Sequence, residues 1–225
     1  MNHFEIGGFT PFTLTDFPGK VAAIVFTQGC NLACPFCHNK SLVPLAGHDA
    51  RRSNGGPRQV LEFLANRRGR LQGVVITGGE PTLHEGLPVF MAEVKRLGFE
   101  IKLDTNGTNP KMLKAVLKKG LADFVAMDIK APWHKYDLLA GTKVDIESLK
   151  LSLELIMSSG QDCLFRTTMV PGLLTGGDID EIKSYLPKGT THLVQKYVPP
   201  ADASGSVLIP SAIGHTEEWT ARLRV

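Results

Sequence analysis

Long apolar runs are missing from this sequence of 225 residues. A helix that crosses a membrane needs about 18 or more consecutive apolar residues, so we expect no membrane-spanning segment. Residues 1–8 lack the basic and apolar stretches of a secretory signal, which predicts a cytoplasmic protein. A strong excess of one charge is missing too, because the formal net charge is only +3. We therefore expect neither a membrane nor a nucleic acid as partner.

Cysteine is scarce, with four residues, and three of them cluster at Cys30, Cys34 and Cys37. In a chain without an export signal, such a cluster indicates metal binding rather than a disulfide framework. The fourth, Cys163, lies within an apolar run that is typical of a strand. We expect Cys163 to be a buried and unreactive thiol.

Arginine is unevenly distributed along the chain. One stretch whose only acidic residue is Glu62 contains Arg51, Arg52, Arg58, Arg67, Arg68 and Arg70. The simpler interpretation is that this stretch forms a solvated helix face and the segments that flank it. The alternative is a docking surface for an acidic partner.

Short apolar, β-branched runs alternate with helical patterns along most of the sequence. The predicted strands are residues 21–27, 73–77, 100–103, 124–129, 163–170 and 192–197. The predicted helices are residues 58–66, 87–97, 111–119, 146–158 and 179–186. We divide the chain into a main unit, 1–198, and a tail, 199–225, in which only a short helix at 216–223 is indicated.

Such alternation predicts parallel strands joined by right-handed helical crossovers, which suits either an open sheet or a barrel. Five of the six strands are followed at once by a polar or glycine-containing group. Barrels gather their sites at the carboxyl ends of many strands, whereas open sheets place them mainly near one switch point. The pattern therefore favours an α/β fold with a partial (β/α)6 barrel.

The three clustered cysteines have the spacing Cys-x3-Cys-x2-Cys. Three thiolates on one loop can hold three irons of a [4Fe-4S] cluster, and the fourth iron then has an open position for chemistry. Zinc is the competing interpretation, with His38 as fourth ligand. Adjacent residues such as Cys37 and His38 seldom converge on one tetrahedral ion, which disfavours zinc.

The stretch Gln28-Gly-Cys-Asn-Leu-Ala-Cys-Pro-Phe-Cys-His-Asn39 resembles the signature of radical S-adenosylmethionine enzymes. The resemblance implies that Phe36 and His38, around the third cysteine, contact the adenine of the cofactor. Gly78-Gly79-Glu80-Pro81 looks like the glycine-rich motif that lies against the methionine amino group in that family. Glycines let a backbone approach a ligand closely, and a carboxylate can accept from an ammonium.

Two further stretches resemble motifs of the glycyl-radical-enzyme activases, as does 13–19 ahead of the first predicted strand. They are Asp104-Thr105-Asn106-Gly107, which implies cofactor contact by Asn106, and Met127-Asp128-Ile129-Lys130. The resemblance implies a monovalent cation, Na⁺ or K⁺, bound by oxygens of Asp104, Thr105 and Asp128. It also implies that Lys130 and Arg166 supply positive charge to the methionine carboxylate or the ribose. Arg166 interrupts an apolar strand, so it must face a polar interior or pair with an acid.

Within the activases, the sequence is most similar to activating proteins of anaerobic ribonucleoside-triphosphate reductase, through residues 17–22 and 194–197. The family histidine expected after the sixth strand is missing, because residues 197–199 are Tyr-Val-Pro. Residues 38–77 hold no cysteine, so the extra ferredoxin-like clusters of some activases are missing too. The resemblance implies a glycyl radical enzyme as protein partner and a flavodoxin or ferredoxin as electron donor.

The implied reaction is a one-electron cleavage of S-adenosylmethionine into methionine and a 5′-deoxyadenosyl radical. The radical takes hydrogen from a glycine α-carbon, a step that side-chain acids and bases cannot perform at useful rates. A second hypothesis keeps this chemistry on a small molecule, a peptide, a tRNA or a pyruvate formate-lyase-type partner. A third hypothesis is an iron–sulfur electron carrier or a zinc-stabilised binding module. This hypothesis does not explain the Gly-Gly-Glu motif or the two Asp motifs.

Overall fold

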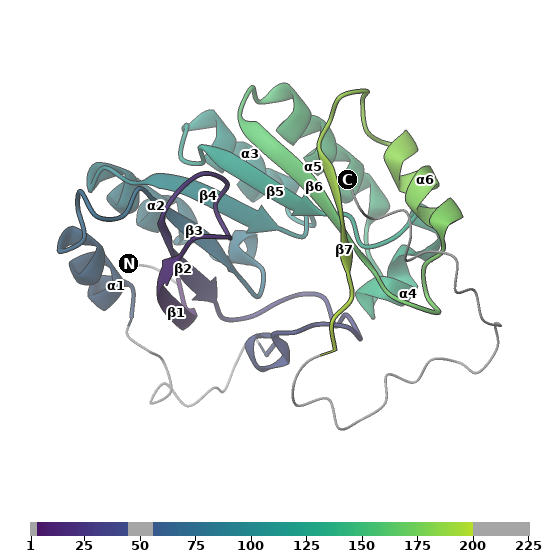
Figure 1. The fold of residues 1–225 in the computed structure, drawn as a ribbon, viewed down its shortest axis with the longest axis horizontal. Coiled ribbons are helices and arrows are strands. Elements are labelled where there is room, and N and C mark those ends of the chain that lie inside the picture. Colours follow the sequence, from purple (N-terminus) through teal and green to yellow (C-terminus); the bar gives the residue numbers. More distant parts are fainter. Residues whose placement is uncertain (1–3, 45–55, 200–225) are drawn as a thin grey trace.

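The computed structural model of the protein describes residues 4–44 and 56–199 (Figure 1). The predicted helix 216–223, residues 200–225 of the predicted tail, and Arg51 and Arg52 of the arginine-rich stretch lie outside the described residues. Among the described helices, none is long and apolar enough to cross a bilayer.

Within the described residues, seven strands form one sheet in which spatial order follows chain order. The strands are β1 (Ile6–Thr13), β2 (Ala22–Thr27), β3 (Gly73–Gly78), β4 (Glu100–Thr105), β5 (Phe124–Asp128), β6 (Asp162–Met169) and β7 (His192–Lys196). Strands β2 to β7 are parallel, and β1 is antiparallel to β2. The six predicted strands are confirmed with bounds within two residues, and so is the partial barrel of parallel strands.

Helices connect the parallel strands, and each of the five predicted helices is present with bounds within three residues. They are α1 (Pro57–Ala65), α2 (Leu87–Arg96), α3 (Pro110–Lys118), α5 (Ile146–Ser158) and α6 (Gly176–Ser184). The sequence analysis missed the short α4 (Tyr136–Ala140) and the 3₁₀ turns η1 (Lys40–Leu42), η3 (Pro81–Leu83) and η4 (Trp133–Lys135). Three of these four elements are only three residues long, too short for a periodic pattern.

Strand β1 was not predicted, and its composition explains the omission. Gly7, Gly8 and Pro11 are residues that disfavour strands. An edge strand tolerates proline because its outer amide need not join a ladder. The space at position 7 is narrow, because an added Cβ would lie 2.4 Å from the end of the Leu42 side chain and 2.6 Å from that of Gln28, and both would have to shift.

The two faces of the sheet have separate apolar cores. The larger core fills the space between the sheet and the helices, which Figure 1 shows along the outer side of an arch of strands. The smaller core lies on the inner face, where Phe17, Ile24 and Val75 pack together against Phe124. An added Cβ at Gly73 would lie 2.8 Å from the Phe17 ring, so the residues before β2 pack tightly against β3. The inner face beyond this small core is left for polar groups.

Candidate functional site

A cavity of about 340 Å³ opens at the carboxyl ends of the parallel strands, above the inner core. This is the end where barrel folds gather their sites. All fourteen residues that the sequence analysis singled out line it: Cys30, Cys34, Phe36, Cys37, His38, Gly78, Gly79, Glu80, Asp104, Thr105, Asn106, Asp128, Lys130 and Arg166. The structure thus brings the predicted site residues together, while their individual roles remain predictions.

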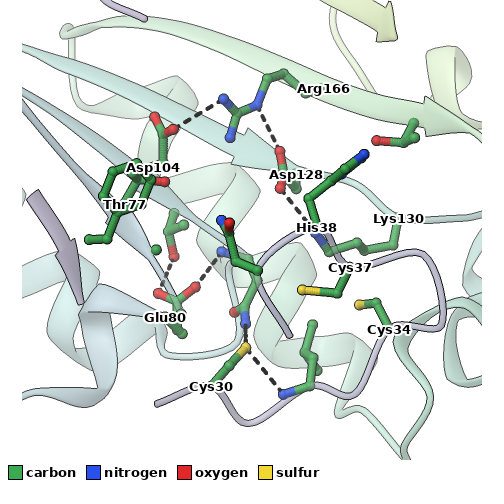
Figure 2. Close-up of a pocket in the computed structure, with 18 of the residues that line it drawn as sticks. Cys30, Cys34, Cys37, His38, Thr77, Glu80, Asp104, Asp128, Lys130 and Arg166 are labelled. Atoms are coloured by element: carbon green, nitrogen blue, oxygen red, sulfur yellow. Dashed lines mark hydrogen bonds and ion pairs between the residues drawn. The ribbon is translucent and has the colours of Figure 1, made fainter. Parts of the chain in front are cut away.

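The loop after β2, which we call the thiol loop (residues 28–39), carries the three cysteines. Backbone hydrogen bonds to other segments hold its start and its middle: Gly29 N to Leu42 O at 2.7 Å, Cys30 N to Val43 O at 3.0 Å and Ala33 N to Ala140 O at 2.9 Å. All three thiols are free, and Figure 2 shows their sulfurs on the same side of the cavity.

The thiols are partly buried. Burial raises the pKa of Cys30 to about 11, and burial likewise raises the pKa of Cys34. Metal coordination deprotonates such thiols outright. Among residues 4–44 and 56–199, no three His, Cys, Asp or Glu side chains converge to hold a single ion, as tetrahedral zinc requires. A cubane cluster does not require this convergence on one ion, because each thiolate binds a different iron.

His38 contacts the end of β7 instead of joining the cysteines as a ligand. Its Nε2 atom forms a hydrogen bond with the carbonyl oxygen of Val198, and its ring centroid is 6.1 Å from that of Tyr197. The thiol loop therefore extends from β2 across to the opposite edge of the sheet. The predicted contact of His38 and Phe36 with an adenine remains a prediction.

The Gly-Gly-Glu motif follows β3 and presses against the thiol loop. Gly78 has φ +109°, which favours glycine. At Gly79, an added Cβ would lie 2.0 Å from the carbonyl oxygen of Gly29, and the Glu80 amide donates to that oxygen at 2.7 Å. Only glycine permits this approach, so the motif first serves to bring two loop backbones together beside the cavity.

Glu80 is buried and joins the ends of β3 and β4. Its Oε1 accepts from the Thr82 hydroxyl at 2.6 Å and from the Thr105 hydroxyl at 2.8 Å. Its Oε2 accepts from the Asn106 amide at 2.6 Å. Burial raises the pKa of Glu80 further than these hydrogen bonds lower it. The carboxylate therefore fixes the Asp-Thr-Asn-Gly motif in place, and its contact with a methionine amino group remains a prediction.

Across the cavity from the thiols, a guanidinium bridges two carboxylates (Figure 2). Arg166 donates through Nε to Asp128 at 2.7 Å and through an η nitrogen to Asp104 at 3.1 Å. Lys130 donates to the second Asp128 oxygen at 2.9 Å. Burial raises the pKa of Asp128, but the charges of Lys130 and Arg166 outweigh burial and hold it far below its ordinary value. The expectation that Arg166 pairs with an acid is confirmed.

Sequence reasoning missed two polar groups that support this network. Lys102 is buried below Asp104 and forms an ion pair with it. The Tyr136 hydroxyl donates to the Asp128 carbonyl and accepts from the Lys130 amide, both at 3.3 Å. A signal for Lys102 existed, because residues two apart on a strand share a face. Tyr136 gave none, since the helix that positions it was not predicted.

Comparisons with known proteins agree on the family. The chain matches the model described as "Radical SAM superfamily" over residues 24–185. It is 31% identical over 199 residues to a Methanocaldococcus jannaschii protein named "Putative glycyl-radical enzyme activating enzyme MJ1227", covering 86% of this chain and 80% of that one. It is 29% identical over 183 residues to the pyruvate formate-lyase-activating enzyme of Streptococcus mutans, covering 76% of this chain and 67% of that one.

The chain is also similar to a relative whose name gives a different activity, and to a solved structure. The 7-carboxy-7-deazaguanine synthase of Halobacterium salinarum is 26% identical over 226 residues, covering 92% of this chain and 82% of that one. The fold is similar to that of Streptococcus suis SuiB bound to S-adenosylmethionine, with a TM-score of 0.62 and 16% identity. That match covers 78% of this chain, which spans only 40% of the length of SuiB.

Proposed function

Because the chain belongs to the radical S-adenosylmethionine superfamily, we propose that it is a glycyl-radical-enzyme activase that acts on anaerobic ribonucleoside-triphosphate reductase. The observation that carries the proposal is the cavity itself. Three free thiols, a Gly-Gly-Glu backbone and the side chains of Asp104, Asp128 and Arg166 come from separate sequence motifs, and all line the same cavity.

The superfamily implies a [4Fe-4S] cluster and S-adenosylmethionine as cofactors. When bound, the cluster supplies the electron that cleaves the sulfonium bond of S-adenosylmethionine. Cys30, Cys34 and Cys37 would hold the cluster and leave one iron without a protein thiolate. Opposite them, Lys130 and Arg166 offer positive charge to the methionine carboxylate. The small inner core below the cavity keeps water from the floor of the site.

The activase assignment is supported by the similarity to glycyl-radical activating proteins over most of the chain. The architecture suits a protein substrate as well. Among the described residues, β7 and β1 do not pair, so the barrel is incomplete and has an open side. A flexible loop of a large partner can enter an open side, whereas a small substrate needs a lid that excludes water.

Charge gives a further reason to favour a protein partner. Arg58 is exposed at the start of α1, and Arg68 and Arg70 are exposed in the segment that follows the helix. Exposed cations can attract an acidic partner at long range. We propose a cytoplasmic protein that receives its electron from a flavodoxin or ferredoxin.

The test is electron paramagnetic resonance after anaerobic mixing of the reconstituted protein with S-adenosylmethionine and anaerobic ribonucleotide reductase from the same source. We expect a glycyl doublet and about one 5′-deoxyadenosine per radical, because each abstraction consumes one cofactor. Without the partner, cleavage of S-adenosylmethionine should be slow. A doublet that appears only with a formate-lyase-type partner would correct the target but keep the activase.

A second candidate is a radical enzyme that acts on a small molecule, a peptide or a tRNA. The similarity to a 7-carboxy-7-deazaguanine synthase over 92% of this chain favours it. The two candidates differ in one measurable respect. Efficient turnover of a free small molecule, together with no glycyl doublet on any partner, would establish the second candidate and reject the first.

A further inference from the structure

A buried lysine, Lys102, lies on the inner face of β4 below the cavity. Its side chain is 4% exposed, and its one polar partner among the described residues is Asp104. The two residues share a face of the strand, and Asp104 lies about 7 Å nearer to the cavity. Lys102 stands in register between Val75 of β3 and Phe124 of β5, which belong to the inner core. An ammonium in such surroundings is held there by its carboxylate partner.

The oxygens of Asp104 are both engaged by cationic side chains of the protein. Lys102 donates to Oδ1, and Arg166 donates to Oδ2 at 3.1 Å. The Thr105 hydroxyl, a third oxygen expected to bind a monovalent cation, donates to Glu80 at 2.8 Å. This half of the expected Na⁺ or K⁺ site is therefore already occupied by protein donors.

Asp128, the remaining expected ligand of the monovalent cation, is also paired with cationic side chains. Asp128 accepts from Arg166 through Oδ1 at 2.7 Å and from Lys130 through Oδ2 at 2.9 Å. Two carboxylates, Asp104 and Asp128, thus face three cations, Lys102, Lys130 and Arg166, so the network has a net charge of +1. One bound carboxylate would neutralise it, and an added metal cation would instead be repelled.

We propose that the Lys102 ammonium takes the place of the monovalent cation in this chain. It neutralises Asp104 from below, which leaves positive charge at Lys130 and Arg166 for the methionine carboxylate. This inference rests on the proposed function in that S-adenosylmethionine is the ligand. The chain then binds S-adenosylmethionine without Na⁺ or K⁺.

The first measurement is equilibrium dialysis of S-adenosylmethionine with the full chain, its cluster reconstituted anaerobically. The buffers contain KCl, NaCl or choline chloride at equal ionic strength, because choline is too bulky for a site made of carboxylate oxygens. We expect dissociation constants that agree within about twofold across the three salts. An affinity that is about tenfold or more higher in KCl or NaCl than in choline chloride would overturn the proposal.

The second measurement uses Lys102→Met, which keeps the length of the side chain and removes its charge. In choline chloride we expect its affinity for S-adenosylmethionine to fall about tenfold, the scale of a lost charged contact. KCl should restore much of the loss, because K⁺ can then bind beside Asp104. The matched control Lys102→Arg keeps the charge and should stay independent of the salt.

Folding provides a readout that needs neither cofactor nor activity. Removing one partner of a buried ion pair leaves the other charge uncompensated. The urea midpoint of cluster-free Lys102→Met should therefore be higher in KCl than in choline chloride, while that of the unmodified chain should be the same in both. Lys102→Met with unchanged affinity and an unchanged midpoint in every salt would contradict the proposal.

The tests of Lys102 and the activase assay can fail independently of each other. Cation-independent binding without a glycyl radical on the reductase would retain the role of Lys102 and reject the target. Binding that depends on K⁺, together with a glycyl radical on the reductase, would retain the target and reject the role of Lys102.

Discussion

Strands β4 and β6 present different chemistry to their two sides. Leu103 and Phe165 are fully buried under the helices, where burial of apolar surface is favourable by itself. Their chain neighbours Asp104 and Arg166 point to the inner side, where the buried Asp104 forms an ion pair with the partly buried Arg166. Burial of such charges is tolerated only while every partner is present. The apolar residues on the outer side therefore stabilise the fold. The charged residues on the inner side affect both folding and the binding of a ligand in the cavity.

The largest effect should come from the thiol loop. Cys34→Ala should abolish cluster binding, because two thiolates cannot hold the three irons that this loop is expected to bind. Iron analysis after anaerobic reconstitution should give about four irons for the unmodified chain and close to none for the variant. Cys163→Ala is the control, because Cys163 packs on the helix side of β6. Equal loss of iron in both variants would show that the two sides of the sheet are not independent.

The next largest effect should be on stability. Phe165→Ala should lower the free energy of unfolding by about 3–5 kcal/mol through lost transfer energy and a cavity in the outer core. The S-adenosylmethionine affinity of the folded fraction should change by less than about twofold, because the ring does not face the cavity. Urea unfolding and calorimetric titration measure the two quantities. A large loss of affinity would mean that the outer core transmits strain to Arg166.

Asp128→Asn should instead reduce cofactor affinity. It weakens the contacts that hold Arg166 and Lys130 in position for the ligand, so cofactor affinity should fall by about 1–3 kcal/mol although the network becomes more positive. Asp162→Asn is a matched control, since it makes the same change at an exposed residue at the start of β6. Calorimetric titration of both variants decides the matter. If Asp162→Asn weakened binding equally, net charge rather than the network would be responsible.

The smallest effect should arise at the start of α6, away from the cavity. Burial raises the pKa of Asp178, but hydrogen bonds from Lys135 and Thr175 outweigh it and lower the pKa below its ordinary value. A lowered folded-state pKa gives stability that is present above the unfolded value of about 4 and is lost as pH falls through the folded value. Asp178→Asn should cost about 1 kcal/mol at pH 7. In urea unfolding, that difference should shrink below about pH 4 and should not grow.

The sequence was most informative where one physical signal was sufficient. The run 73–77 is apolar and β-branched because a parallel strand is buried on both sides. The cysteine spacing indicates a metal site, because three closely spaced cysteines on one loop are typical of metal ligands rather than of a disulfide framework. Polar groups that follow successive strands had to converge, because parallel strands end on the same edge of the sheet. These signals were enough to predict the partial barrel, and together with the family resemblance they identified fourteen of the residues that line its cavity.

The remainder depended on tertiary contacts that no local pattern records. Strand β1 contains two glycines and a proline, and it exists because it pairs with β2. Lys102 looked like an ordinary strand residue until the side chains of Asp104 and Arg166 could be placed beside it. The sequence resemblance alone therefore gave no reason to expect an ammonium beside Asp104.

The thiol loop has structural support that does not involve its sulfur atoms. The amides of Gly29, Cys30 and Ala33 all donate to carbonyl oxygens of other segments, and His38 is bonded to the end of β7. These amides should exchange slowly with deuterium even in the cluster-free chain, since their protection comes from the fold. Insertion of a cluster then requires little ordering of the backbone. After oxygen has destroyed the cluster, the loop should keep its conformation. The site should then accept a new cluster without unfolding of the chain.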